Sequence, residues 1–388
     1  MLLVATSCYR VDEVCAVRCD SSACPGELAC GADLLCHAAG SLDCSQLGLD
    51  APPMVDSTSD ADTCTTSTLF AKVCHAAGSP VIELTGPIDT GGASACLAGT
   101  VDGLPACIVV GTNISVHDLT LTGDVPLVVI ATGALSISGG VDAASHNDGN
   151  GIPLRRGPGT RATCGTQPGG GSAHGGGGAG GAYGDRAGNG GSGANGAVGG
   201  VGSGADATLA LRGGCEGGAG GGSGASGPVG AGGGALFLLA TSITIVSDAR
   251  INASGAGGGN SFTLHGGAGG GAGGLIALEA STIAVDGASR VFAQGGGGAA
   301  GGPDTGTSTT THGSDPINAG TLTLGGTDSN GGGLGGNGGV GVSGANDGGS
   351  GDQGGGGGGS VGLIVYHGSL TASSGVLTTV FFPTQQAR

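Results

Sequence analysis

Aromatic residues are almost absent from this sequence. Its 388 residues include no tryptophan, three tyrosines and six phenylalanines. Large globular cores normally depend on such side chains, so a conventional multidomain globular protein is excluded. Runs of 18 or more apolar residues are also missing, which argues against a membrane-spanning helix.

Positive charge is scarce as well. The chain has 11 Lys+Arg against 28 Asp+Glu, a net charge of −17, and Lys72 is its one lysine. Nucleic-acid binding needs clustered lysine and arginine to neutralise phosphates, so a nucleic-acid partner is excluded. Charge-driven docking on an anionic membrane is excluded for the same reason, which leaves a lipid anchor as the only membrane attachment.

Glycine, in contrast, occurs 96 times, and the segments between the glycine-rich tracts repeat one another. Residues Ala235–Gly255 contain three apolar runs, each too short for a helix and rich in strand-forming residues. The runs are Leu236–Ala240, Ile243–Val246 and Arg250–Ala253, and looser copies of the unit lie at Leu275–Gly295, Pro126–Ser145 and Val361–Phe382. A repeated unit that cannot bury its own apolar face predicts an all-β solenoid.

Glycine-rich insertions interrupt the solenoid at about 146–234, 255–274 and 295–360. Each insertion follows the third strand of one copy and precedes the first strand of the next. If the coils stack in register, all the insertions leave from the same corner and run side by side.

Within the first insertion glycine recurs with a period of three, and Ala187 is the one interruption. This glycine frame consists of Gly175, Gly178, Gly181, Gly184, Gly190, Gly193, Gly196, Gly199 and Gly202. Three residues per turn is the geometry of polyproline-II-like helices, whose backbone groups point outward. We therefore expect a bundle of antiparallel polyglycine-II helices in which the frame glycines face a neighbouring backbone. A flexible coil is the alternative, because ordering a glycine costs at least ~1–2 kcal/mol and a hydrogen bond returns about 0.5–1.5 kcal/mol.

The 13 cysteines form an odd set. Residues 1–8, MLLVATSC, resemble the end of a bacterial lipoprotein signal, so we expect Cys8 to carry lipid. The other 12 can all pair in an oxidising compartment, which predicts a secreted or outer-surface protein. Six of them should form a disulfide-rich module, with zinc binding as the alternative: Cys15, Cys19, Cys24, Cys30, Cys36 and Cys44. The other six should pair with the cysteine nearest in sequence: Cys64 with Cys74, Cys96 with Cys107 and Cys164 with Cys215.

The expected organisation has four parts. Residues 1–8 are the signal remnant, 9–48 the disulfide-rich module, 49–80 an acidic linker with the Cys64/Cys74 segment, and 81–388 the solenoid with its insertions.

The sequence offers little catalytic or metal-binding chemistry. Gly358–Gly362 matches G-x-S-x-G, but glycines precede the serine and a strand, not a helix, is expected after it. Asp142, Asp248 and Asp286 occupy comparable turns, where stacked coils would bring them into one column. Turn formation is their simpler role, and the carboxylates of a polysaccharide lyase or hydrolase are the alternative. No cofactor or metal site is expected, since residues 201–209 only approach a Ca²⁺-binding nonapeptide.

The chain resembles a group of glycine-rich secreted proteins of myxobacterial type in four stretches, ACIVVGTNISV, PLVVIATGALSISGGVDAAS, LRGGCEGG and ALFLLATSITIVSDARINASGAGGG. The segment CPGELACGADLLC resembles their N-terminal cysteine modules. The resemblance spans roughly Val81–Phe382 and implies a right-handed parallel β-helix with long glycine-rich insertions. It implies no biochemical function, because none is assigned to that group.

Together these features predict a non-enzymatic structural or adhesive protein of the bacterial cell surface. Ordered glycine tracts would present flat, nearly uncharged, backbone-rich faces suited to glycans or repetitive envelope surfaces; this step rests on analogy between folds. The alternatives are a purely structural envelope component and a carbohydrate-active β-helix enzyme.

Overall fold

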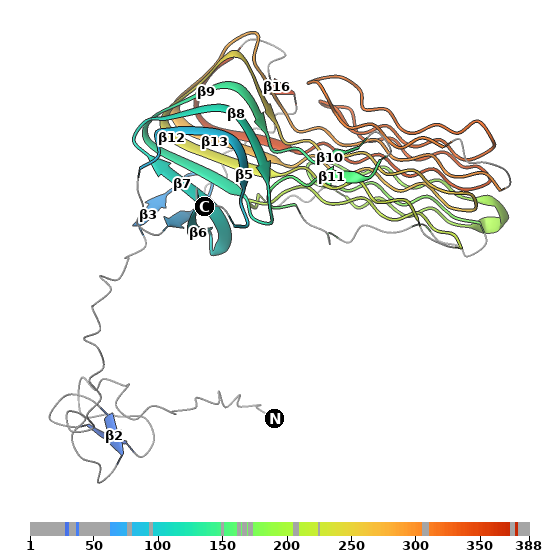
Figure 1. Cartoon of the computed structure of the whole chain (residues 1–388), viewed down its shortest axis with the longest axis horizontal. Coiled ribbons are helices and arrows are strands. Elements are labelled where there is room, and N and C mark those ends of the chain that lie inside the picture. The colour runs from blue at the N-terminus through green and yellow to red at the C-terminus, as the bar shows by residue number, and fades with distance from the viewer. Residues whose placement is uncertain are drawn as a thin grey trace. The chain divides into compact units, whose positions relative to one another are not determined.

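The computed structural model describes residues 63–75, 80–92, 96–148, 151–160, 164, 169, 174–204, 209–223, 226–304 and 310–372, together with strand positions 28–30, 36–38 and 377–378 (Figure 1). The chain divides into two units, Met1–Ala61 and Asp62–Arg388. In the first unit, β1 (Leu28–Cys30) and β2 (Cys36–Ala38) form an antiparallel ladder. The second unit contains the repeats and the glycine-rich tracts.

The second unit is all-β, and its described residues contain no α-helix. One 12-stranded sheet and one two-stranded sheet include all of its strands. The strands are β3 (Thr63–Thr66), β4 (Lys72–His75), β5 (Glu83–Asp89), β6 (Leu97–Val101), β7 (Leu104–Gly111), β8 (Ile114–Thr122), β9 (Leu127–Asp142), β10 (His146–Asn147), β11 (Pro153–Arg155), β12 (Ala235–Asn252), β13 (Leu275–Val285), β14 (Arg290–Phe292), β15 (Leu363–Ala372) and β16 (Leu377–Thr378).

The repeated segments stack as parallel rungs of the curled sheet. β12 lies between β9 and β13, and β15 pairs with the far side of β13. From β12 to β13 and β14 the register keeps a constant offset of 40 residues, as in Leu236↔Ile276 and Arg250↔Arg290. The β9–β12 ladder is irregular between Ala240 and Ser242 and again between Val246 and Arg250. These two breaks separate the three runs that the sequence predicts, and the sheet curls as Figure 1 shows.

Polar side chains stabilise the corners between runs. Ser247 and Asp248 adopt φ angles of 60° and 58°, a left-handed conformation that turns the chain. The backbone N–H of Ser247 donates to Oδ2 of Asp286 on the next rung, at 2.8 Å. At the other corner the Thr241 hydroxyl donates to the carbonyl of Thr132, at 2.9 Å. Each corner is thus tied to a neighbouring rung.

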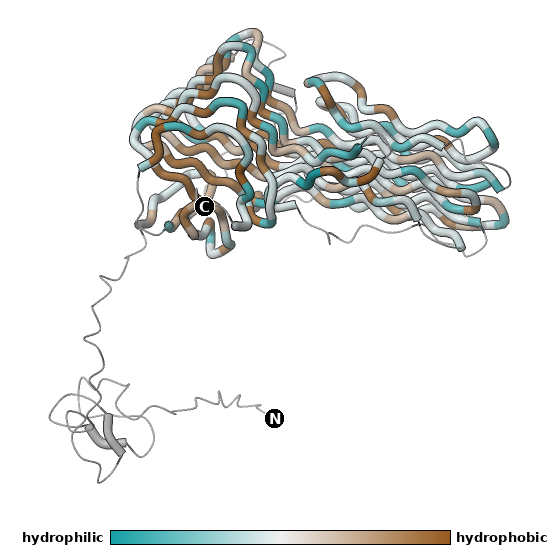
Figure 2. Tube along the Cα trace, viewed as in Figure 1, coloured by the Kyte–Doolittle hydropathy of each residue, from teal (hydrophilic) through white to brown (hydrophobic). Residues whose placement is uncertain are grey.

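The first run of each rung is buried on both faces. Leu238 and Val129 belong to the core inside the curl, whereas Phe237 and Val128 belong to a second core outside it. Continuous apolar runs are typical of strands covered on both sides, which explains why these segments do not alternate. Figure 2 shows this apolar character along the curled sheet and its loss in the glycine-rich tracts.

The outer core is covered in part by residues 63–75, the Cys64/Cys74 segment that we expected to accompany the acidic linker outside the solenoid. Instead β4 pairs with β6 of the large sheet, and the Phe70 ring meets that of Phe237 edge-on at 4.8 Å. The buried Glu279 carboxylate accepts the Ser67 hydroxyl at 2.6 Å and the Thr68 N–H at 2.7 Å. The boundary therefore lies before this segment, between Ala61 and Asp62.

The three glycine-rich insertions, which we now call the excursions, leave the sheet from one corner and lie side by side, as expected for coils that stack in register. Ala143 N–H donates to the Asn252 carbonyl at 2.8 Å, and Ala253 N–H donates to that of Phe292 at 3.0 Å. On the return, Leu275 N–H donates to the Gly234 carbonyl at 3.0 Å. The tracts extend together from the sheet in Figure 1. We call the assembly formed by the described residues within 174–234, 253–274 and 293–362 the glycine bundle.

Residues 266–274 lie at the centre of the glycine bundle and are hydrogen-bonded to neighbours on all sides. Every third N–H donates to the same neighbour: those of Gly266, Gly269 and Ala272 donate to the carbonyls of Gly221, Gly218 and Cys215. The other partners are 253–256 and 354–360 as acceptors, and 178–181, 230–233 and 296–299 as donors to the segment's carbonyls. Most backbone groups of a segment almost without side chains are therefore satisfied by other backbone.

The chain directions in the glycine bundle differ from the antiparallel arrangement that we expected. Residues 266–274 run antiparallel to 215–221, 253–256 and 296–299, but parallel to 178–181, 230–233 and 354–360. Each excursion has an outgoing limb, which leads away from the sheet, and a returning limb, which leads back to it. Because all the excursions start at the same corner, the returning limb 266–274 packs against outgoing limbs of opposite direction and against other returning limbs of the same direction.

A segment surrounded on all sides has no free face for side chains. A Cβ atom at Gly269 would overlap the Ala179 carbonyl oxygen, and one at Gly270 would overlap that of Gly296. The central segment therefore needs glycine at nearly every position, and not only at one in three. Alanine is found where the packing leaves room, as at the fully buried Ala268 and Ala272.

We predict that two glycine-to-alanine substitutions differ in their effect on stability. Gly269→Ala places a methyl group against backbone, so the free energy of unfolding should fall by about 1–3 kcal/mol. Gly204→Ala meets no atom within 4 Å, so stability should be unchanged or rise by about 0.4–1 kcal/mol through reduced unfolded-state entropy. Urea denaturation of both variants measures this, and equal stabilities would contradict the packed arrangement.

Candidate functional site: a groove on the third-strand face

The third run of each rung alternates between the core and an outer face. Val141, Ile251 and Val291 point into the core and are at most 2% exposed. Between them, the outer face has two columns in parallel register: Gly140, Arg250 and Arg290 in one, and Asp142, Asn252 and Phe292 in the other.

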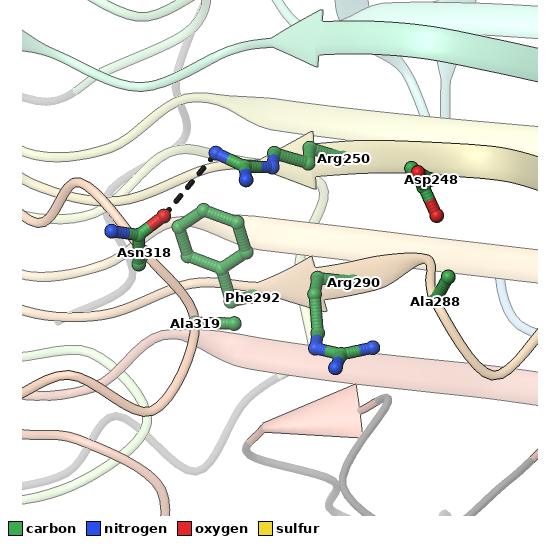
Figure 3. Close-up of a pocket in the computed structure, with 7 residues that line it drawn as sticks. All are labelled: Asp248, Arg250, Ala288, Arg290, Phe292, Asn318 and Ala319. Carbon is green, nitrogen blue, oxygen red and sulfur yellow. Dashed lines mark hydrogen bonds between the residues drawn. The ribbon is translucent and has the colours of Figure 1, made fainter.

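Part of the third excursion covers this face. The Arg250 guanidinium donates through Nη1 to Oδ1 of Asn318 at 3.2 Å, and Phe292 beneath is buried. Figure 3 shows Arg250 reaching toward Asn318, with Arg290 on the other side of the Phe292 ring. Two cavities of about 230 and 260 Å³ lie between the sheet and this cover. Because both are lined by Arg250 and Phe292, we treat them as one feature, the third-strand groove.

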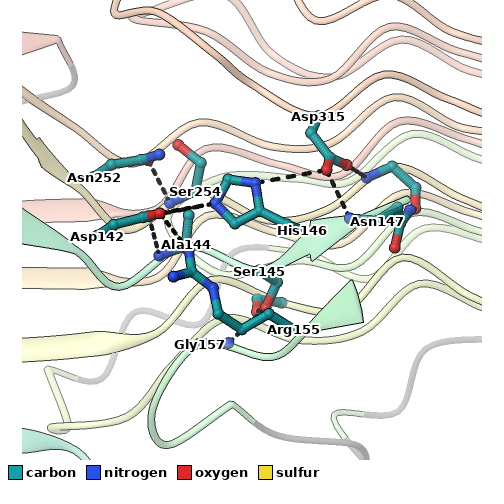
Figure 4. Close-up of polar contacts among 12 residues, drawn as sticks. Asp142, Ala144, Ser145, His146, Asn147, Arg155, Gly157, Asn252, Ser254 and Asp315 are labelled. Carbon is teal, nitrogen blue, oxygen red and sulfur yellow. Dashed lines mark hydrogen bonds and ion pairs between the residues drawn. The ribbon is translucent and has the colours of Figure 1, made fainter. Parts of the chain in front are cut away.

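A charged network closes one end of the groove (Figure 4). The Asp142 carboxylate pairs with the Arg155 guanidinium and lies 3.1 Å from Nε2 of His146. The opposite nitrogen of the same ring, Nδ1, lies 3.8 Å from Oδ2 of Asp315. Asp315 also accepts the backbone N–H groups of Asn147 and Gly257, each at 2.7 Å. This network joins the sheet to all the excursions.

The two carboxylates of the network have pKa values shifted in opposite directions. Burial by itself raises the pKa of Asp142, but the hydrogen bond and charge of His146 and the charge of Arg155 outweigh it, so the pKa is lowered. Burial dominates at Asp315 and raises its pKa, although the N–H groups of Gly257 and Asn147 oppose the effect. Asp142 is therefore stabilised as a carboxylate, whereas Asp315 is ionised at a cost.

The three aspartates of the predicted column are not brought together. Asp142 is in register with Asn252 at the end of the third run. Asp248 and Asp286 lie at the preceding corner, where Asp286 also accepts the Ser289 N–H at 2.7 Å. The column of three carboxylates is therefore wrong, and Asp286 forms the turn contacts expected of a turn-forming residue.

Metal ligation and serine chemistry find no support in the described part of the chain. No three or more histidine, cysteine, aspartate or glutamate side chains there are grouped to hold a metal ion. Ser360 is fully buried, and its Oγ accepts the Tyr183 N–H at 2.8 Å. Part of the segment that approaches the Ca²⁺ motif, residues 205–208, lies outside the described residues.

Three disulfides join the cysteines that sequence proximity pairs: Cys64–Cys74, Cys96–Cys107 and Cys164–Cys215. Such bonds are typical of proteins that fold in an oxidising compartment. The proposed lipid acceptor Cys8 and the side chains of the six-cysteine module lie outside the described residues.

The predicted glycine frame lies against neighbouring backbone with one exception. A Cβ atom would come within 2.6 Å of a carbonyl oxygen at Gly175, Gly178, Gly181, Gly184, Gly190, Gly193, Gly199 and Gly202. Gly196 instead has a φ of 82° and open space around it, because it ends the 3₁₀ turn η2 (Ala194–Gly196). Residues outside the frame, such as Gly180 and Gly191, are equally enclosed.

Of the residues of the groove, the sequence singled out Asp142 and Asp248 but not the two arginines. Arg250 and Arg290 occupy the same position in the third run of two copies that are 40 residues apart. An alignment of the copies reveals this signal. His146 and Arg155 meet in the short β10–β11 ladder, and Asp315 joins them only through the packing of the excursions, so no such signal marks them.

Comparison of the chain with protein-family models, characterised proteins and solved structures finds no match. Among the described residues, no helix has the length and apolar character needed to cross a membrane. The functional argument therefore rests on the geometry of the chain itself.

We predict that Asp142→Asn destabilises the protein in a pH-dependent manner. The folded pKa of Asp142 lies below the ordinary value of 3.8, so its contribution is complete above that pH and is lost as the pH falls through the folded pKa. The loss at pH 7 should be about 1–2 kcal/mol, since Asp142 is partly screened by solvent, and should shrink toward pH 3.

Urea denaturation at the two pH values measures the effect of Asp142→Asn. The matched control is Asp124→Asn, which alters an exposed carboxylate that forms no ion pair among the described residues. A loss at pH 7 no larger than that of the control would contradict the stabilising role of the network.

Proposed function

We propose that this protein is a non-enzymatic structural and adhesive element of the cell surface, in which the glycine bundle presents faces that bind glycans or repetitive envelope surfaces. The observation that carries the proposal is the hydrogen bonding of residues 266–274 to neighbours on every side. A cross-bonded bundle holds its surface groups in fixed positions, as a binding face requires. A flexible tether would lose more entropy on binding.

We also infer a finer account of the fold. We infer that the parallel rungs of the curled sheet form a right-handed parallel β-helix and that the excursions form a polyglycine-II bundle. The constant 40-residue register supports the first inference, and hydrogen bonding at every third residue supports the second. Membership in the myxobacterial glycine-rich group remains a proposal that rests on the sequence pattern.

The surface of the glycine bundle has the chemistry of a neutral binding face. Leu322, Leu324 and Leu334 are 44%, 57% and 54% exposed. Leu324 lies within segment 323–326, and Leu322 and Leu334 directly precede the adjacent segments 323–326 and 335–338. The backbones of these two segments are paired by hydrogen bonds of 2.8–2.9 Å from Gly335 to Gly326 and from Gly338 to Thr323. Exposed aliphatic groups beside peptide groups match the apolar C–H faces and hydroxyls of sugars.

The cell-surface location is the remaining part of the proposal. The three disulfides support an oxidising environment. Attachment through lipid on Cys8 rests on the sequence, and radiolabelled palmitate incorporation that persists in Cys8→Ser would refute it.

A glycan array probed with the full chain tests adhesion. We expect retention on at least one class of neutral glycan, and a loss of about tenfold in Leu324→Ser/Leu334→Ser, because that variant removes the exposed aliphatic groups of the glycine bundle. The control is Ile82→Ser, which changes an aliphatic residue that is 77% exposed on the curled sheet. If no glycan retains the protein, adhesion is refuted and a purely structural envelope role is favoured. If both variants lose retention equally, the glycine bundle is not the binding face.

A further inference from the structure

The third-strand groove contains two arginines whose placement is unexplained by the fold. Arg250 and Arg290 are register partners on adjacent parallel rungs, and neighbouring strands lie about 4.8 Å apart. Like charges directly opposite each other destabilise a sheet. The chain has only 11 Lys+Arg, so two of them side by side are a local concentration of its scarce positive charge.

Neither arginine is neutralised by the protein. Among the described residues, Arg155 and Arg156 form ion pairs with carboxylates, but Arg250 and Arg290 form none. Their hydrogen bonds use Nη1 only: Arg250 donates to Asn318, and Arg290 donates to the carbonyls of Gly287 and Ser289 at 2.9 and 2.7 Å. The remaining N–H donors of both guanidinium groups are available to a ligand.

We propose that the third-strand groove binds an acidic saccharide and that Arg250 and Arg290 hold its carboxylates on the two sides of the Phe292 ring. The planar donors of arginine match a carboxylate in geometry and charge. A bound carboxylate would also relieve the repulsion between the two rungs. This site lies on the curled sheet and goes beyond the adhesive face proposed for the glycine bundle.

The rest of the groove fits a sugar chain. Asp248 and Asn318 line the cavity that contains both arginines and offer hydrogen-bond partners to hydroxyls. In the preceding rung the column position is Gly140, whose missing side chain leaves room for the second cavity. Asp142 at that end is already paired with Arg155 and His146, so its charge is compensated within the protein.

Titration calorimetry with the full chain at pH 7 and 150 mM NaCl tests the proposal. The probe is hexagalacturonate, and its fully methyl-esterified form is the matched ligand that lacks the negative charge. We expect the parent protein to bind hexagalacturonate at least about tenfold more tightly than the ester, because only the free carboxylate forms charge-assisted hydrogen bonds. This comparison needs no variant, and absence of binding or equal affinity for both ligands would overturn the proposal.

Two double variants locate the site. Arg250→Gln/Arg290→Gln should raise the Kd for hexagalacturonate at least about tenfold, since it removes both carboxylate donors. Lys72→Gln/Arg186→Gln removes the same charge from exposed positions outside the groove and should change the Kd less than about twofold. Equal weakening in both would show non-specific charge attraction and overturn the proposal. Leu324→Ser/Leu334→Ser should bind hexagalacturonate like the parent, so failure of the bundle face and failure of this groove are distinguishable.

Discussion

The need to satisfy backbone hydrogen-bonding groups governs this structure. A segment such as residues 266–274 has almost no side chains to bury, so the hydrophobic effect alone cannot order it. Its N–H and C=O groups instead pair with the backbones of surrounding segments, among them 215–221, 253–256 and 354–360. Every such bond needs a neighbour at close range, and glycine permits that approach because it has no Cβ. The glycine content is thus a requirement of packing.

The curled sheet provides the alignment on which the glycine bundle depends. Loop closure and ordering entropy would oppose the assembly of long glycine tracts from a free chain. Because the rungs stack in register, Ala143, Ala253 and the residues after Phe292 start side by side. The Cys164–Cys215 disulfide fixes a further point within the first excursion. The two-sided apolar core of the sheet therefore stabilises the bundle by holding the ends of its limbs.

Sequence reasoning predicted those features that depend on local pattern. The three runs of β12, the common corner of the excursions and the proximity of Cys96 to Cys107 follow from strand-forming residues and spacing. The mixed chain directions and the exception at Gly196 could not be predicted in this way, because they depend on which limbs pack side by side and on where each tract turns. The meeting of His146, the partner of Asp142, with Asp315 is set by the packing of two different excursions. No spacing within the sequence encodes that contact.

Amide exchange of ¹⁵N-glycine-labelled protein, followed by NMR, tests the central claim most directly. The claim is that backbone hydrogen bonds order the glycine bundle as firmly as the sheet. The amides of Gly266, Gly269 and Gly270, which donate to Gly221, Gly218 and Gly357, should then exchange as slowly as that of Gly111 in β7. Exchange of these three amides at the rate of an unprotected chain, with Gly111 still protected, would contradict the account.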